Sequence, residues 1–313
     1  MAQTLEALTR RTASMQGIRS VVHTMKTLSV INSAPYEQAA RAIESYHDTV
    51  LEGLHAFVSR TGPMISTTRD VAARVFVVFG SDHGLCGNYN EALATHVRRH
   101  IGLNDAPSTT ILCIGAQMAD ALKDQGLKIE KALFPPASVD GIGRLANLLT
   151  KRLDSIRHSN QPREISVSLA YFARSGDGSQ APRIAALLPL DPDLLQDLAT
   201  RPWSSRSLPT FSMQPGDLFM ALIRAHLFAS LFRAAAEALV TENAARLALM
   251  QQAEQSVDDR LEMLRSDTQA LRQSEITTEL LDVIIGFEAL KKDRKSGKPV
   301  HRGADEDGDR EET

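Results

Sequence analysis

The chain has 313 residues, 43% of them hydrophobic, which is enough for a sizeable core in one large domain or two ordinary ones. Its 35 lysines and arginines nearly balance 38 aspartates and glutamates, which argues against nucleic acid as the main partner. Cys86 and Cys113 are too few for a disulfide framework. Because no secretory signal opens the chain and no run of consecutive apolar residues approaches the roughly 20 needed to span a bilayer, we expect a soluble protein without direct membrane insertion.

Residues 1–60 are predicted to form a long N-terminal coiled-coil helix. Apolar residues recur at helical spacing, and six of them mark the pattern: Leu8, Met15, Ile18, Val22, Met25 and Leu28. Pro35 lacks a backbone donor and crowds the preceding turn. The helix is therefore predicted to kink or restart near Asn32–Pro35.

Residues 70–205 follow a different pattern, typical of an α/β domain. Short apolar runs predict strands at 75–79, 109–114, 165–172 and 184–188, and helices are predicted at 91–100, 116–124 and 145–157. Strands that alternate with helices indicate a mainly parallel, Rossmann-like sheet. The turn Gly176-Asp177-Gly178 between the last two strands predicts one antiparallel hairpin.

Residues 216–290 are predicted to form a second coiled-coil helix of about 110 Å. A strict 3,4 spacing joins eight seam positions, most of them apolar: Leu247, Met250, Glu254, Val257, Leu261, Leu264, Thr268 and Leu271. Another chain could be the partner, but the N-terminal helix makes an intramolecular antiparallel pair the more economical interpretation. Residues 291–313 carry a basic stretch and then an acidic one without apolar periodicity, so we predict a disordered charged tail.

The loop Ser81–Gly87 is the clearest candidate for chemistry. It lacks both Gly-x-Gly-x-x-Gly spacing and a Gly-Lys-Ser/Thr, so a tight strand-to-helix turn is favoured over a nucleotide site. Asp82 and His83 lie beside Cys86, but no oxyanion loop accompanies them, and no catalytic residue is expected. Neither His-x-x-x-His nor Cys-x-x-Cys occurs, so we expect no metal and no cofactor.

Five segments in order resemble the gamma subunit of F-type ATP synthase. They are Ile18–Leu28 (IRSVVHTMKTL), Ser81–Gly87 (SDHGLCG) followed by Asn90, Leu187–Leu190 (LLPL), Glu242–Met250 (ENAARLALM) and Arg272–Leu280 (RQSEITTEL). His83 stands where the family usually has Arg, and Asn32–Pro35 replaces a basic cluster. These departures suggest a divergent gamma, such as that of the sodium-linked type of ATPase, although the coupling ion, proton or sodium, stays open.

The resemblance implies a central-stalk rotor that is not an enzyme on its own. Its coiled coil would turn inside a ring of three alpha and three beta subunits, and its α/β domain would contact the epsilon subunit and the membrane c-ring. It would be a peripheral protein on the cytoplasmic side of the inner membrane. The segment Ile276–Leu290 would be the tip held in the ring's apolar bearing.

The resemblance also implies a partner-contact or torque role for six residues, namely Met25, Lys26, Arg246, Gln273, Thr277 and Glu279. Taken as residues alone, Met25 would be seam packing and the polar residues of the long helix a solvated face. Two other functions remain open: a cytosolic scaffold whose coiled coil dimerises and whose α/β domain binds a ligand, and a nucleotide-dependent enzyme that uses Ser81–Gly87.

Overall fold

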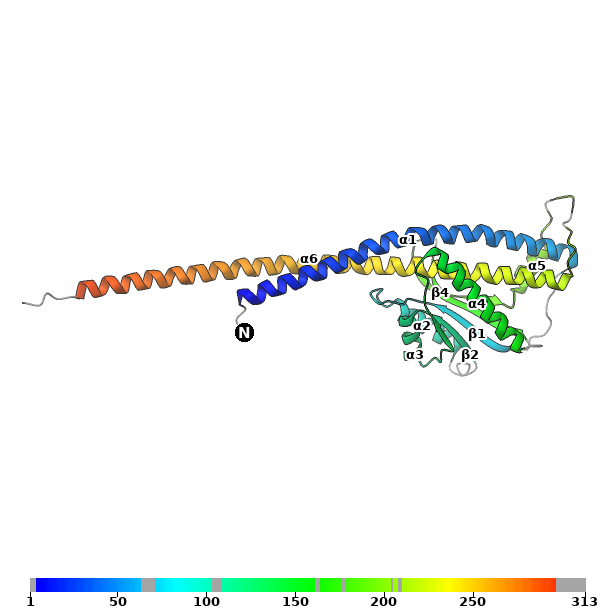
Figure 1. The fold of residues 1–313 in the computed structure, drawn as a ribbon, viewed down its shortest axis with the longest axis horizontal. Coiled ribbons are helices and arrows are strands. Elements are labelled where there is room, and N and C mark those ends of the chain that lie inside the picture. The colour runs from blue at the N-terminus through cyan, green and yellow to red at the C-terminus, as the bar shows by residue number, and fades with distance from the viewer. Residues whose placement is uncertain are drawn as a thin grey trace, which may run out of the picture. The chain divides into compact units, whose positions relative to one another are not determined.

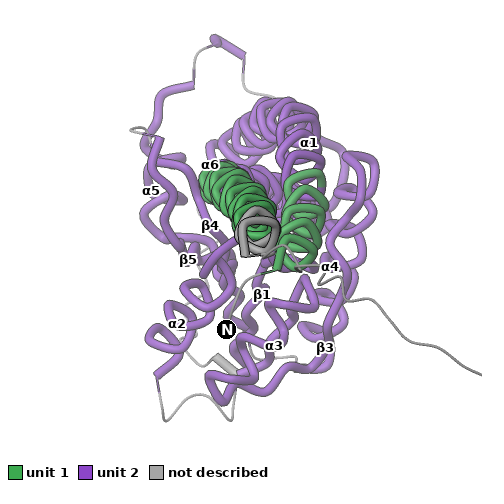
Figure 2. The backbone as a smooth tube through the Cα atoms, turned by 90° about the vertical axis from the view of Figure 1, so that its left-hand side faces the viewer, with its two compact units in different colours: residues 1–20, 255–313 green, residues 21–254 purple. Residues whose placement is uncertain are grey.

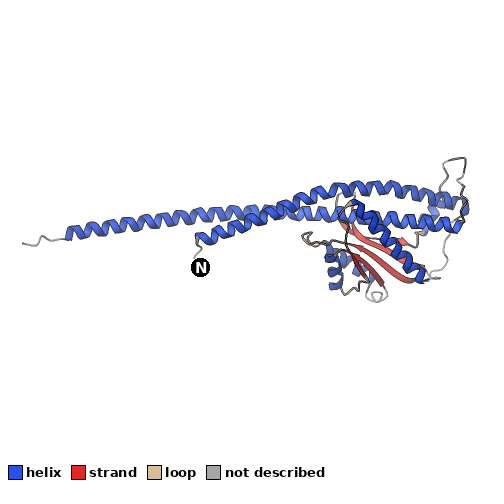
Figure 3. Ribbon diagram, in the orientation of Figure 1, coloured by secondary structure: helices blue, strands red, loops and turns tan. Residues whose placement is uncertain are grey.

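The computed structural model describes residues 4–62, 71–102, 109–160, 164–175, 178–203, 205–207 and 210–296. Two long helices, α1 (Leu5–Thr61) and α6 (Pro215–Ser296), flank an α/β domain in the sequence (Figures 1 and 3). The elements between them are β1 (Val71–Phe79), α2 (Tyr89–Ile101), β2 (Thr109–Ile114), α3 (Ala116–Asp124), β3 (Lys131–Leu133), α4 (Val139–Asn160), β4 (Glu164–Arg174), β5 (Gln180–Leu188) and α5 (Pro192–Thr200). The predicted fold class is confirmed.

The sheet has the strand order β3-β2-β1-β4-β5. β1 pairs in parallel with β2 on one side and with β4 on the other, and β3 extends the parallel part beyond β2. β5 is antiparallel to β4, as predicted for the last two strands. The turn predicted at Gly176-Asp177-Gly178 falls largely outside the described residues. The chain leaves β1 toward β3 and then returns through α4 to β4, so the strand order reverses between β1 and β4.

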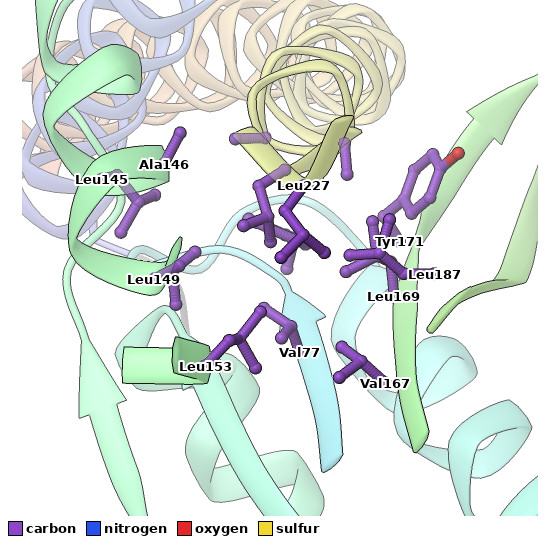
Figure 4. Close-up of a cluster of buried hydrophobic side chains, with 14 of the residues drawn as sticks. Val77, Leu145, Ala146, Leu149, Leu153, Val167, Leu169, Tyr171, Leu187 and Leu227 are labelled. Atoms are coloured by element: carbon purple, nitrogen blue, oxygen red, sulfur yellow. The ribbon is translucent and has the colours of Figure 1, made fainter. Parts of the chain in front are cut away.

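Helices cover both faces of this sheet because β1 is apolar on both. Val75, Val77 and Phe79 point into a core that α4, α1 and α6 complete, and Figure 4 shows α4 and α6 side chains meeting the sheet there. Phe76 and Val78 point into a second core formed with α2 and α3. A strand buried on both faces reads as a continuous apolar run, which is why β1 could be predicted from the sequence.

Two short elements were not predicted. β3 has three residues and pairs only with β2, which is too short for a recognisable alternation. The sequence of α5 does carry a helix-start signal. Its N-cap, Asp191, accepts a hydrogen bond from the Asp193 amide at 3.0 Å, and Pro192 occupies the first turn.

The chain divides into two compact units, coloured in Figure 2: residues 1–20 with 255–313, and residues 21–254. Within the larger unit α1 and α6 are antiparallel neighbours. Lys26 pairs with Glu254, Glu44 with Arg233, and His47 with His226. The residue number of the partner on α6 therefore decreases as the residue number on α1 increases. In the smaller unit, Arg19 pairs with Asp258 at 2.6 Å.

The predicted seam of α6 matches its burial. Met250, Val257, Leu261 and Leu264 are buried, and the other four positions are at least half-covered. From residue 272 onward every residue up to 288 is exposed. The coiled-coil spacing therefore ends where the burial ends.

The apolar pattern predicted for the N-terminal helix separates into two faces. Leu8 and Val22 are buried, but Ile18 and Leu28 are about half exposed. The seam of α1 repeats every seven residues, through Leu8, Val22, Tyr36 and others, and Ile18 and Leu28 lie off that line. The helical spacing of the six residues is confirmed, but that spacing alone does not separate the buried seam from the exposed face.

Pro35 lies inside α1, which is continuous from Leu5 to Thr61, so the restart predicted near Asn32–Pro35 is wrong. Proline still withholds one donor from the carbonyl four residues earlier. The predicted local kink stays a prediction.

The end of α6 also differs from expectation. The helix continues to Ser296, so residues 291–296 are helical rather than disordered, and 297–313 lie outside the described residues.

Among the described residues, one helix is apolar and long enough to cross a membrane by composition alone: the Pro215–Glu288 stretch of α6, with an 18-residue window of mean hydropathy 1.4. This stretch contains no long run of consecutive apolar residues, because Arg224, His226 and Arg233 interrupt it. The core helix of a soluble protein passes the same test, and Leu227 and Leu231 of this helix are buried against the sheet domain.

Candidate functional site

The β1–α2 loop, which carries the family-like SDHGLCG segment, is held as a rigid turn. The Asn90 Oδ1 accepts from the Ser81 amide at 3.0 Å, and its Nδ2 donates to the Ser81 Oγ at 2.7 Å. Both side chains are buried. Gly87 has φ 67°, a backbone conformation that glycine adopts without steric cost. The polar atoms of Ser81 and Asn90 are thus used within the turn rather than left for a ligand.

Two further polar groups of the loop are also engaged. The Asp82 Oδ1 accepts from the Ala116 amide at the start of α3, at 3.0 Å. The His83 carbonyl accepts from the Ser81 Oγ at 2.9 Å. Burial raises the pKa of the Cys86 thiol, which therefore stays protonated and unreactive at neutral pH. Nothing in this loop activates a nucleophile, which fits the prediction of a structural turn.

The place where an open α/β sheet usually binds its ligand is occupied by α6. Ligands sit beyond the carboxyl ends of the strands where the strand order reverses. Here, near the end of β4, the Thr241 Oγ1 of α6 lies 3.4 Å from the Phe172 carbonyl. Phe79, at the end of β1, faces Ala238 and Leu239 of α6 around a cavity of about 10 Å³. That volume is close to the least that holds one water. No small-molecule substrate fits there.

Hydrogen bonds fix α6 in this position. The Tyr89 hydroxyl lies 3.1 Å from the Ala238 carbonyl, to which it donates, and 3.0 Å from the Thr241 Oγ1. Glu242 is buried and accepts from the Arg246 Nη2 at 2.6 Å. Burial raises the pKa of Glu242 against the opposing effect of Arg246.

Arg246 was predicted as a partner-contact residue, and in this chain it faces inward. Besides Glu242, its Nη2 reaches the His83 carbonyl at 3.4 Å. It thus connects α6 with the β1–α2 loop, 163 residues away in the sequence. Nothing in the sequence pattern signals this contact.

Met25 and Lys26, also predicted as partner contacts, are half-buried on α1. The Lys26 Nζ pairs with the Glu254 carboxylate at 2.6 Å, and the His23 Nδ1 lies 3.2 Å from the same group. Hydrogen bonds from Lys26 and then His23 lower the pKa of Glu254. A seam glutamate is thereby matched to one lysine, which favours one register of the two helices.

Gln273, Thr277 and Glu279 lie on the exposed part of α6. The Thr277 Oγ1 donates to the Gln273 carbonyl at 2.8 Å, a contact within the helix. The side chains of all three remain accessible.

An exposed apolar stripe surrounds these three residues. Seven large apolar side chains of this segment have between 46% and 73% of their surface exposed: Ile276, Leu280, Leu281, Val283, Ile284, Ile285 and Phe287. At about 100° per residue, Leu280 and Ile284 fall on the same face as Gln273 and Thr277, with Glu279 at its border. Contiguous exposed apolar surface of this kind is typical of an interaction site.

A metal centre is not indicated in the part of the chain that the structure describes, where no group of three or more His, Cys, Asp or Glu side chains is arranged to bind an ion.

Two long helices with an α/β domain between them in the sequence, a filled crevice and exposed apolar residues on one helix together define a partner-binding class of protein. The family model described as ATP synthase matches residues 4–290. The ATP synthase gamma chain of Alkaliphilus metalliredigens is 24% identical over 299 residues, covering 92% of this chain and 99% of that relative. The gamma chain of Dictyoglomus thermophilum is 25% identical over 298 residues, covering 93% and 99%.

Solved structures share the fold. A chain of the Euglena gracilis mitochondrial ATP synthase, described as OSCP/F1/c-ring in rotational state 3, has a TM-score of 0.62 at 17% identity, covering 96% of this chain and 99% of that one. A chain of the rotor of the same synthase in rotational state 1 has a TM-score of 0.59 at 16% identity, covering 87% and 98%. The chain therefore belongs to the ATP synthase gamma family.

Proposed function

We propose that this chain couples ion translocation to ATP synthesis or hydrolysis by turning inside a ring of alpha and beta subunits. It acts without catalytic groups of its own, with the epsilon subunit and the membrane c-ring as further partners. It works as a peripheral protein on the cytoplasmic side of the inner membrane. The observation that carries the proposal is the exposed apolar stripe of α6 between Ile276 and Phe287.

That stripe needs a partner outside the chain. Residues 272–288 are all exposed, so these side chains gain nothing from the fold itself. Burying a leucine or isoleucine contributes about 1.5–3 kcal/mol, and a stripe of several such residues is a large driving force for seating in an apolar sleeve. Glu279 would then meet polar groups at the border of the sleeve. Gln273 and Thr277 lie on the apolar face itself and would need hydrogen-bond partners within the sleeve.

Rotation would act through differential contact. The exposed segment of α6 is not symmetric about its own axis, because the charged Asp282 lies opposite the apolar Leu280 and Ile284. Each orientation would therefore present a different surface to a surrounding subunit. A shaft that binds two conformations of a catalytic subunit unequally shifts the balance between them.

The role proposed for Met25, Lys26 and Arg246 differs from that of the exposed residues Gln273, Thr277 and Glu279. Lys26 and Arg246 are paired within the chain, with Glu254 and Glu242. We propose that Lys26 acts mainly by setting the register of α1 and α6, and that Arg246 holds α6 against the β1–α2 loop. Met25 would contribute both seam packing and surface.

The scaffold alternative is less well supported. A dimerising coiled coil needs a free seam, but the seam residues Met250, Val257, Leu261 and Leu264 are buried within the chain. A ligand-binding α/β domain needs an open crevice, which α6 fills. The enzyme alternative meets the same obstacle.

The test is co-expression with the alpha and beta subunits encoded beside this chain, followed by size-exclusion chromatography and an ATPase assay. We expect a complex of three alpha, three beta and one copy of this chain, with ATPase activity only in the complex. The chain alone should not hydrolyse ATP. If it elutes as a homodimer and leaves alpha and beta unassembled, the scaffold alternative replaces the rotor.

A further inference from the structure

Arg174, the last residue of β4, joins the sheet to both long helices. Its backbone amide and its Nε both donate to the Glu237 Oε1 of α6 at 2.9 Å, and its Nη2 donates to the Oε2 at 3.1 Å. On the other side, its Nη1 lies 3.6 Å from the Glu37 Oε1 of α1. One residue at the end of β4 therefore contacts two other segments of the chain, α1 and α6.

The Arg174–Glu237 contact is partly shielded from water. The Glu237 side chain is 15% exposed and that of Arg174 is 38% exposed. Burial by itself would raise the pKa of Glu237, but the hydrogen bonds from Arg174 outweigh it and hold that pKa below its ordinary value. A bidentate contact between charged groups is both stronger and more directional than a neutral hydrogen bond.

Within the described part of the chain, other directional contacts also join the α/β domain to α6, but none of them is a bidentate ion pair. The Tyr89 hydroxyl makes neutral buried hydrogen bonds with Ala238 and Thr241, and the Arg246 Nη2 reaches the His83 carbonyl at 3.4 Å.

Apolar packing of Leu227 and Leu231 on the sheet is strong but not directional. Arg224 of α6 pairs with Asp154 of α4 at 3.0 Å, but the Arg224 side chain is 60% exposed. Water-exposed pairs of this kind contribute little.

We propose that Arg174 is a positioning residue of the rotor. By holding Glu237 and Glu37 together, it keeps the α/β domain at one rotational setting on the helix pair, so that torque applied to the domain turns the helices without slippage. The inference rests on the proposed function, because it assigns this contact a task only in a rotor.

The test uses the full chain in a membrane-bound complex with its partner subunits. The variants are Arg174→Ala, Arg174→Lys and Glu237→Gln. The matched control is Arg233→Ala, since Arg233 pairs with Glu44 at 3.3 Å and so connects α6 to α1 without the sheet. Two rates are measured in sealed vesicles, ATP hydrolysis and ATP-driven ion uptake, and their ratio gives the coupling.

Arg174→Ala is expected to lower the number of ions moved per ATP several-fold, while hydrolysis stays close to the wild-type rate. The Arg174→Lys complex should have a ratio of ions moved per ATP between those of the wild type and Arg174→Ala, because lysine keeps the charge but loses the bidentate geometry. Glu237→Gln should resemble Arg174→Lys, and Arg233→Ala should keep the wild-type ratio.

Two results overturn the inference: an Arg174→Ala complex with the wild-type ratio, or hydrolysis and uptake that fall in proportion, as a merely structural defect predicts. If Arg174→Ala does not assemble, the ratios of Arg174→Lys and Glu237→Gln decide in the same way. Failure of the unaltered chain to assemble with alpha and beta is a separate result, because it removes the proposed function itself.

Discussion

Removing two apolar side chains from the exposed stripe should weaken assembly without weakening the fold. The double variant is Leu280→Ala with Ile284→Ala, whose side chains are 58% and 46% exposed. Full burial of each contributes about 1.5–3 kcal/mol, and roughly half of each surface is available to a partner. The expected loss on binding is therefore about 2 kcal/mol for the pair, or roughly 30-fold in Kd.

Two assays separate assembly from folding. The first is titration of a preassembled alpha–beta ring with labelled chain, and the second is thermal unfolding of the chain alone. Since neither side chain is packed, unfolding should change by no more than about 0.5 kcal/mol. Asp282→Ala, an exposed change on the opposite side of the same helix, is the matched control and should leave both unchanged. An unaltered Kd for the double variant would refute the reasoning, as would a large loss of stability in the isolated chain.

Three further predictions concern the chain alone. Leu231→Ala should lower the free energy of unfolding by about 2–5 kcal/mol in chemical denaturation, because Leu231 is fully buried in the main core. Burial, and next the neighbouring His47, lower the pKa of His226 to about 4 in the folded chain. The unfolded chain takes up that proton below about pH 6.5, so stability should fall by up to roughly 3 kcal/mol between pH 6.5 and 4, and less in His226→Gln. Cys86 and Cys113 are buried with raised pKa, Cys113 to about 12, so both thiols should react with Ellman's reagent only after denaturation.

Each of these three predictions has an outcome that would contradict it. A loss below about 1 kcal/mol for Leu231→Ala would mean that the core collapses around the substitution rather than leaving a cavity. If the free energy of unfolding depends on pH equally in the parent chain and in His226→Gln, the loss of stability in acid comes from other groups. Fast reaction of either thiol in the native chain would show that the segment covering it opens readily.

The elements that follow from local periodicity were predictable from the sequence. The apolar run of β1 and the glycine after it placed the first strand of the sheet, and the 3,4 spacing from Leu247 to Leu271 identified the buried seam of α6. The exposed tip was visible as apolar residues beyond the last seam position. These features depend on residues a few positions apart, so the sequence carries them directly.

The contacts between distant segments were settled by the tertiary structure alone. Arg246 is a polar residue on a helix in the sequence, and only the fold turns it toward Glu242 and the His83 carbonyl. Ile18 and Leu28 fit a helical period, and only the position of the partner helix leaves them outside the seam.

The clearest case is the crevice of the α/β domain. The sequence by itself determined a Rossmann-like sheet between two long helices, and such a sheet offers a ligand site at its strand ends. Only the tertiary structure decided that Ala238 and Leu239 of α6 fill that site. The physical reason is that propensity and periodicity act between near neighbours, whereas the choice of which apolar face covers which sheet edge is made by packing among segments far apart in the chain.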